Sequence, residues 1–185
     1  CDFKYNIPNE IKNVISMKLA SIEIPNSWYL YSKNKKNNQF NITITKDYYS
    51  DSFTIYVPDG NYDSDTLVEY LNNKYFYLNQ NSTSDDDTPD LLSYIKFSVD
   101  QYNNKTKIEL VGDTDDEISF SLDFNDDPSE DLTDRLGWTL GFREKEYVDI
   151  EDFILSEALF DAGGDRYIYF SINDYQYNVN ETNII

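Results

Sequence analysis

Hydrophobic and polar residues alternate over several short stretches of the chain, the pattern of strands that bury one face. Near the beginning, apolar positions alternate in one phase over residues 15–19 and in the other phase over residues 22–24. This predicts a long first strand with a β-bulge or bend at residues 20–21 and an end at Pro25. The other alternating stretches are 40–44, 53–57, 95–99, 118–124, 138–142 and 168–172. The pattern therefore predicts an all-β sandwich or barrel.

Turn and helix signals divide these stretches. Asn103–Asn104 lies between two alternating runs and predicts a hairpin, because Asn tolerates the positive φ of tight turns. Residues 64–73 predict a short helix, with Asp63, Ser64 or Thr66 as the N-cap and apolar residues at helical spacing.

A second short helix is predicted over residues 128–135. Asp127 stands at the cap position, Pro128 at the first helical position and Gly137 just past the end. Residues 79–90 show no periodicity and predict a surface loop. The predicted core includes Phe97, Val99, Phe120, Leu122, Leu140, Phe170 and Ile172.

Length and charge narrow the possible functions. The chain of 185 residues fits one domain, and its start at Cys1 without a methionine indicates a module of a longer protein. The formal net charge of -20 repels phosphate backbones and anionic lipids, so we expect neither nucleic acid nor membrane as a direct partner. The single cysteine excludes an internal disulfide.

The catalytic repertoire is narrow. There is no histidine, which excludes Ser-His-Asp and Cys-His centres, and neither a phosphate-binding loop nor a dinucleotide fingerprint is present. Acidic clusters at 85–87, 113–117 and 123–127 lack the spacing of a calcium-binding loop, and they are interpreted as solvated loops, with a calcium site as the alternative. We therefore expect no enzymatic activity, metal or cofactor. A hydrolase with two facing carboxylates stays open, because sequence does not show such a distance.

Aromatic side chains are the other candidates for an interaction site. Trp28, Tyr29 and Tyr31 follow the Pro25 stop, and Trp138 lies in an alternating stretch. Large rings most often lie in the core or anchor an interface, whereas exposed rings on a β-sandwich can stack on sugars. These four residues are therefore the candidate interaction residues, for a protein neighbour or for a glycan.

Four segments in order carry a resemblance to a known family. They are NVISMKLASIEIPNSWYLYSKNKKNNQF (13–40), TIYVPDGNYDSDTLVEYLN (54–72), LGWTLGFR (136–143) and RYIYFSINDYQ (166–176). Together they resemble the single jelly-roll capsid proteins, penton-like or minor capsid, of nucleocytoplasmic large DNA viruses. The resemblance implies an antiparallel eight-stranded jelly-roll sandwich with one or two short helices. It also implies a structural role in the virion, at a capsid vertex, in the minor capsid or at a fibre base.

Three classes of function remain: a structural virion protein, a glycan-binding β-sandwich that uses exposed aromatics, and a carboxylate hydrolase. The first is the expected one, because it fits both the order of motifs and the missing catalytic residues. Its expected partners are other capsid or virion proteins, including further copies of the chain. The contacts are expected at the 27–39 and 79–90 loops, since loops at the ends of a sandwich carry function.

Overall fold

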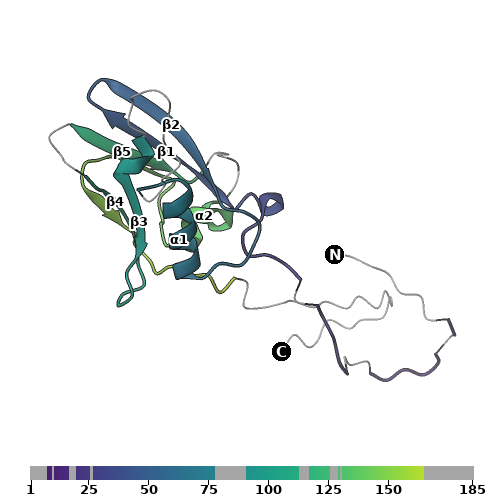
Figure 1. Ribbon diagram of the computed structural model, residues 1–185. Coiled ribbons are helices and arrows are strands. Elements are labelled where there is room, and N and C mark those ends of the chain that lie inside the picture. The colour runs from purple at the N-terminus through teal and green to yellow at the C-terminus, as the bar shows by residue number, and fades with distance from the viewer. Residues whose placement is uncertain are drawn as a thin grey trace.

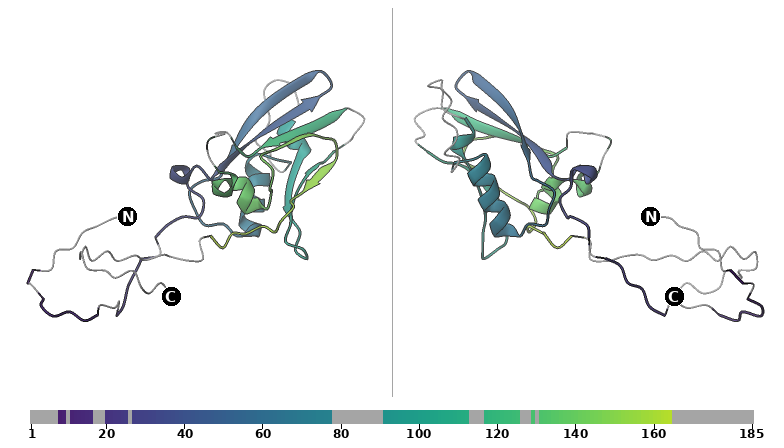
Figure 2. Two further views of the ribbon diagram at one scale, coloured as in Figure 1. Left: turned by 180° about the vertical axis from the view of Figure 1, so that it is seen from behind. Right: turned by 45° about the vertical axis from the view of Figure 1, so that its right-hand side comes forward.

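The computed structural model describes residues 8–9, 11–16, 20–25, 27–77, 91–112, 117–125, 129 and 131–164. A body of two antiparallel sheets and a few short helices holds the core, and the described residues 11–16 and 20–25 extend away from it (Figure 1). The same arrangement is visible from behind and from the side (Figure 2). The described part of the chain is therefore mainly β, as the alternation predicts.

One sheet has four strands in the order β2-β1-β5-β6. These are β1 (Gln39–Lys46), β2 (Tyr49–Tyr56), β5 (Ile118–Asp123) and β6 (Glu146–Ile150). Ile42 of β1 lies opposite Phe53 of β2 on one side and Leu122 of β5 on the other. The alternation predicted the first three of these strands, but it did not identify β6.

The other sheet has three strands in the order β3-β4-β7. They are β3 (Ile95–Val99), β4 (Thr106–Leu110) and the short β7 (Phe153–Leu155). The predicted hairpin joins β3 to β4, and Asn104 has the positive φ, 52°, that its turn requires. Asp100 fixes this turn, since its carboxylate accepts the Tyr102 N–H at 2.7 Å. The described residues form seven strands in total.

The first predicted helix is confirmed as α1 (Ser64–Lys74). Its N-cap is Asp63, whose carboxylate accepts the Thr66 N–H at 2.9 Å. The remaining helical turns are short: η1 (Lys33–Lys35), η2 (Leu91–Tyr94), η3 (Leu132–Asp134) and α2 (Leu136–Leu140).

The strand predicted over 138–142 is wrong, and the helix predicted over 128–135 is misplaced. Of the latter stretch, residues 132–134 form the 3₁₀ turn η3, and the α-helix α2 begins only at Leu136. Gly137 lies inside α2, where a Cβ would come within 2.5 Å of Phe124 Cγ. Gly141 ends α2 with φ 94°, a left-handed conformation that glycine adopts without strain.

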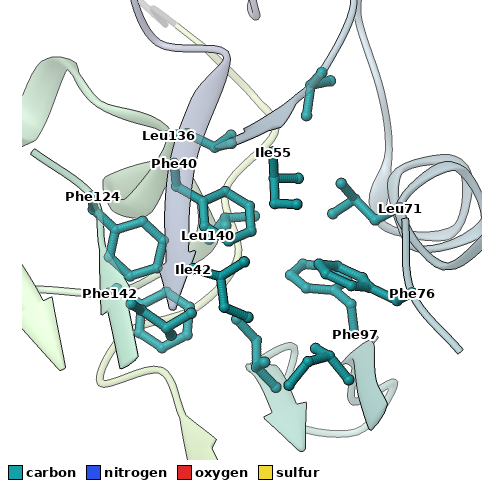
Figure 3. Close-up of a cluster of buried hydrophobic side chains, with 14 of the residues drawn as sticks. Phe40, Ile42, Ile55, Leu71, Phe76, Phe97, Phe124, Leu136, Leu140 and Phe142 are labelled. Carbon is teal, nitrogen blue, oxygen red and sulfur yellow. The ribbon is translucent and has the colours of Figure 1, made fainter. Parts of the chain in front are cut away.

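The core lies between the two sheets and is completed by α1 and α2. Figure 3 shows Phe40 and Ile42 of β1 facing Phe97 of β3, with Leu71 of α1 beside them. Phe124 and Phe142 stack at 4.9 Å between ring centroids. Of the predicted core, Phe97, Phe120, Leu122 and Leu140 are buried, Val99 is partly buried, and Phe170 and Ile172 lie outside the described residues.

Helix α1 closes the gap between one edge of each sheet. The buried Asn72 side chain donates to Phe97 O at 2.7 Å and accepts the Phe97 N–H at 2.9 Å, at the outer edge of β3. The Tyr75 hydroxyl, just after α1, donates to Tyr56 O at 3.2 Å and accepts the Tyr56 N–H, at the outer edge of β2. One side chain of α1 and that of the residue just after it thus satisfy backbone groups that edge strands leave unpaired.

The predicted first strand is wrong for the residues that the structure describes there. Residues 11–16 and 20–25 form no strand, so no β-bulge exists at residues 20–21. Ile15 is 99% exposed, and Ile22 and Ile24 are 46% and 44% exposed. An alternating apolar segment therefore lies outside the body and pairs with no strand of the described residues. We call the described residues 11–16 and 20–25 the N-terminal arm.

Candidate interaction surface

The loop after the arm is fixed in shape by short polar side chains. Asn61 Oδ1 accepts the Leu30 N–H at 2.7 Å, and Asn37 Nδ2 donates to Leu30 O at 2.7 Å. Asp59 Oδ1 accepts the Lys33 N–H at 2.8 Å. Because Asn and Asp side chains can replace backbone partners in this way, the exposed loop keeps one conformation. It presents a defined surface at the base of the arm.

Tyr31 does not belong to that surface. Its backbone forms an antiparallel bridge with Gly60, and its side chain is fully buried, with its ring 5.8 Å from that of Tyr62. Burial, and then the negative charge of Asp161, raises the pKa of the Tyr31 hydroxyl. This predicted interaction residue is therefore a core residue, because the bridge to Gly60 turns its ring inward.

Trp28 and Tyr29 are exposed, as an interaction surface requires, at 41% and 53%. Trp28 also lines a cavity of about 210 Å³ together with Leu30, Lys35, Asn61 and residues 162–164. Gly164 lies close to Leu30, because a Cβ there would come within 3.3 Å of Leu30 Cδ1. The tertiary structure thus brings the base of the arm against a segment more than 130 residues later in the sequence.

Trp138 lies on α2 and is 37% exposed. The Arg143 guanidinium stacks on its ring at 3.8 Å, and Arg143 Nη1 donates to Trp138 O at 2.9 Å. The Glu157 carboxylate accepts the Arg143 N–H at 3.0 Å and the Tyr147 hydroxyl at 2.8 Å. A planar cation over an indole is a favourable contact that also holds the ring in place. Arg143 therefore covers one face of the Trp138 ring and holds the ring in place.

Most of the predicted acidic clusters lie outside the described residues, including 85–87, 113–116 and 126–127, and so does the 79–90 loop. Of the described acids, Asp123 has a structural role, since its Oδ1 accepts the Asn125 N–H at 2.8 Å. Within the described ranges, no group of three or more His, Cys, Asp or Glu side chains could hold a metal ion. The calcium alternative thus has no site in this part of the chain.

Sequence reasoning missed a surface of small polar side chains on the outer face of the four-stranded sheet. Thr43 lies opposite Ser52 and Ser121, and its hydroxyl is 2.8 Å from that of Ser52. The rows on either side place Asn41 between Thr54 and Asp123, and Thr45 between Ser50 and Ser119. The signal was present as the polar half of each alternating strand, but only the register shows that the rows align.

Comparisons with protein-family models, with curated proteins and with solved structures found no match to this chain. None of the helices in the described ranges is long and apolar enough to cross a membrane. The functional interpretation therefore rests on the sequence and on the geometry given above.

Proposed function

We propose that the protein is a structural virion component of a large DNA virus, serving at a capsid vertex, in the minor capsid or at a fibre base. The observation that carries this proposal is the N-terminal arm beside a well-packed sandwich. A segment that leaves Ile15 almost fully exposed has a form suited to contact with a neighbour. The fixed loop at its base supports the same role, since an assembly contact requires a surface of constant shape.

The eight-stranded jelly roll belongs to this proposal. Two antiparallel sheets that share one core support it, as does the packing of α1 over one side of the sandwich. The predicted strand at 168–172 lies outside the described residues, and the predicted first strand is unpaired in the single chain. An additional strand supplied by a neighbouring chain is compatible with both facts. The proposed role is non-catalytic and requires no cofactor.

The test has two parts. The purified chain should form discrete oligomers in sedimentation velocity and negative-stain electron microscopy over a series of concentration and salt. An antiserum raised against it should label purified virus particles from its source and should be neutralised by the recombinant chain. A chain that stays monomeric throughout, with no labelling of particles, would contradict the proposal.

One observation favours glycan binding as a second candidate function. Trp28 lines a cavity together with Lys35 and Asn61, so one aromatic and two polar residues surround it, a combination typical of small-ligand sites. Binding on a glycan array that is lost in Trp28→Ala and kept in Trp138→Ala would support this function. An array without signal for the wild-type chain would exclude it for the glycans tested.

A further inference from the structure

We propose that residues 20–24 of the N-terminal arm pair, as an added strand, with the free edge of β2 in a second copy of this chain. The inference rests on the assembly role proposed above and names its partner and its contact. It follows from three features of the described residues. One is an alternating segment that joins no sheet, the second is a long open strand edge, and the third is that this segment extends away from the β2 edge of its own chain.

The donor is the stretch Ala20–Ile24. Ala20, Ile22 and Ile24 alternate with Ser21 and Glu23, the arrangement of a strand with one apolar and one polar face. All five residues are exposed and form no strand in the single chain. Pro25 follows directly, and since proline lacks an N–H it would end the pairing there. This segment therefore has the pattern of a strand but joins no sheet formed by the described residues.

The acceptor is identified by comparing the outer edges of the four outermost strands. The edge of β3 is closed, because Asn72 satisfies both backbone groups of Phe97 and the Tyr77 N–H donates to Ile95 O at 3.0 Å. Strand β6 is irregular, with a register shift against β5 and a positive φ of 51° at Asp149. Strand β7 has only three residues. Strand β2, with eight residues, is the long regular edge that remains.

Backbone direction shows which part of β2 is open. The Val57 N–H donates to Asn38 O, toward β1, whereas the backbone of Tyr56 faces Tyr75 on the outer side. Because backbone groups point to alternate sides along a strand, those of residues 50, 52 and 54 point to the outer side. The Ser52 N–H already donates there to the carboxylate of its neighbour Asp51 at 2.9 Å, a local hydrogen bond that an added strand would replace. Among the described residues, the outer edge without a partner from another element is therefore the five-residue stretch 50–54.

Donor and acceptor match in length, and a register that sets Ile22 beside Phe53 also matches the polarity of their faces. Five residues of extended chain measure about 16 Å in each, at about 3.3 Å per residue. Ile22 and Ile24 would join the inner side, where Phe53 is only partly buried. Ser21 and Glu23 would then extend the outer face of small polar side chains. A strand added in this way continues both surfaces of the sheet.

The second copy, and not the arm's own body, is favoured by placement and by charge. The arm leaves the body at the Tyr31–Gly60 bridge and extends away from β2, as the three views of Figures 1 and 2 agree. Residues 11–25 contain Lys12, Lys18 and Glu23, for a net charge of +1 against -20 for the whole chain; Glu23 is the one charge within the pairing residues 20–24, and both lysines precede them. A segment with this charge meets an acidic copy with less repulsion than two bodies meet each other.

The first experiment measures association. In sedimentation equilibrium at about 0.15 M salt, the wild-type chain should associate, and Ile22→Asp/Ile24→Asp should weaken that association at least tenfold. The matched control Val148→Asp changes an apolar side chain, 67% exposed, on the competing edge strand β6 and should leave association unchanged. Equal association of wild type and arm variant would overturn the strand-exchange inference and leave the assembly role standing.

The second experiment identifies the contact between chains. Two differently tagged copies, both with Cys1→Ser, carry Ser21→Cys in one and Ser52→Cys in the other. Oxidation should link them, whereas Ser98→Cys on the closed strand β3 should give no link with Ser21→Cys. A third variant carries both Ser21→Cys and Ser52→Cys in one chain. If oxidation forms a disulfide within that chain but no link between the two singly substituted copies, the arm folds back on its own β2 and the exchange is overturned. A wild-type chain that stays monomeric under all conditions would contradict both this inference and the assembly role.

Discussion

Asn72 is the side chain on which the closure of the β3 edge depends, and its replacement gives the sharpest test of the fold. The residue is only 3% exposed, and its amide makes two hydrogen bonds to Phe97, at 2.7 Å to the carbonyl and 2.9 Å from the N–H. Asn72→Leu keeps a similar volume on the same face of α1 but removes both hydrogen bonds. The N–H and C=O of Phe97 then stay buried without partners.

The expected loss follows from those two groups. An unsatisfied buried polar group costs about 1 to 3 kcal/mol, so two of them cost about 2 to 6 kcal/mol. Leucine offsets up to about 0.7 kcal/mol of this loss through its higher helix propensity. Burial of its apolar side chain offsets a further fraction. The free energy of unfolding should therefore fall by about 2 to 4 kcal/mol.

Urea unfolding followed by far-ultraviolet circular dichroism measures this change by linear extrapolation. The matched control is Asn73→Leu, the same substitution at the next position of α1, where the side chain is exposed. It gains the same helix propensity and should change the free energy of unfolding by less than about 0.5 kcal/mol. A loss below about 1 kcal/mol for Asn72→Leu would refute the edge-closing role of this side chain.

Further predictions concern packing, burial and charge. Gly137→Ala would place a Cβ within 2.5 Å of Phe124 Cγ and should lower the free energy of unfolding by about 1 to 3 kcal/mol, measured by urea unfolding. Tyr31→Phe removes a buried hydroxyl that has no hydrogen-bond partner among the described residues, so thermal unfolding should show unchanged or higher stability. Burial, and then Tyr75, raises the pKa of Tyr70 to about 12, so the unfolded state loses its proton first. The contribution of the protonated Tyr70 hydroxyl to the free energy of unfolding should be complete below pH 10 and should be lost as the pH rises toward 12. Tyr70→Phe should reduce this loss in alkaline unfolding curves. Association of the wild-type chain should strengthen from about 0.01 to 0.15 M salt, because screening reduces repulsion between copies of charge -20; sedimentation showing dissociation with rising salt would contradict this.

Much of the sandwich was predictable from local pattern. The alternation over 40–44, 53–57, 95–99 and 118–124 corresponds to β1, β2, β3 and β5, because a half-buried strand must place apolar residues at every second position. Strands β6 and β7 were missed, since both are short strands at the outer edges of their sheets. In β7, Phe153 and Leu155 are exposed and only Ile154 between them is turned inward, so apolar residues occupy both faces.

The candidate surface was predicted only in part. Trp28, Tyr29 and Trp138 are exposed, but no local pattern indicated that Arg143 would cover one face of the Trp138 ring or that Tyr31 would bridge to Gly60 and turn inward. These contacts join residues from different turns, and an aromatic residue has the same local pattern whether its ring is buried or exposed.

By itself the sequence determined the strand periodicity, a helix cap among Asp63, Ser64 and Thr66 and a hairpin turn at Asn103–Asn104, because each depends on residues close together in the chain. The structure selects Asp63 as the cap and gives Asn104 the positive φ. Residues 138–142 were predicted as a strand because their apolar residues alternate, although the spacing of Leu136 and Leu140 also fits a helix. Only the tertiary structure decided for the helix, where Gly137 lets α2 approach the Phe124 ring and Gly141 supplies the left-handed end. The N-terminal arm is a second case in which local pattern alone does not decide the structure. Its pattern specifies a strand, but pairing requires a free sheet edge within reach, and where that edge lies is a property of the assembled structure.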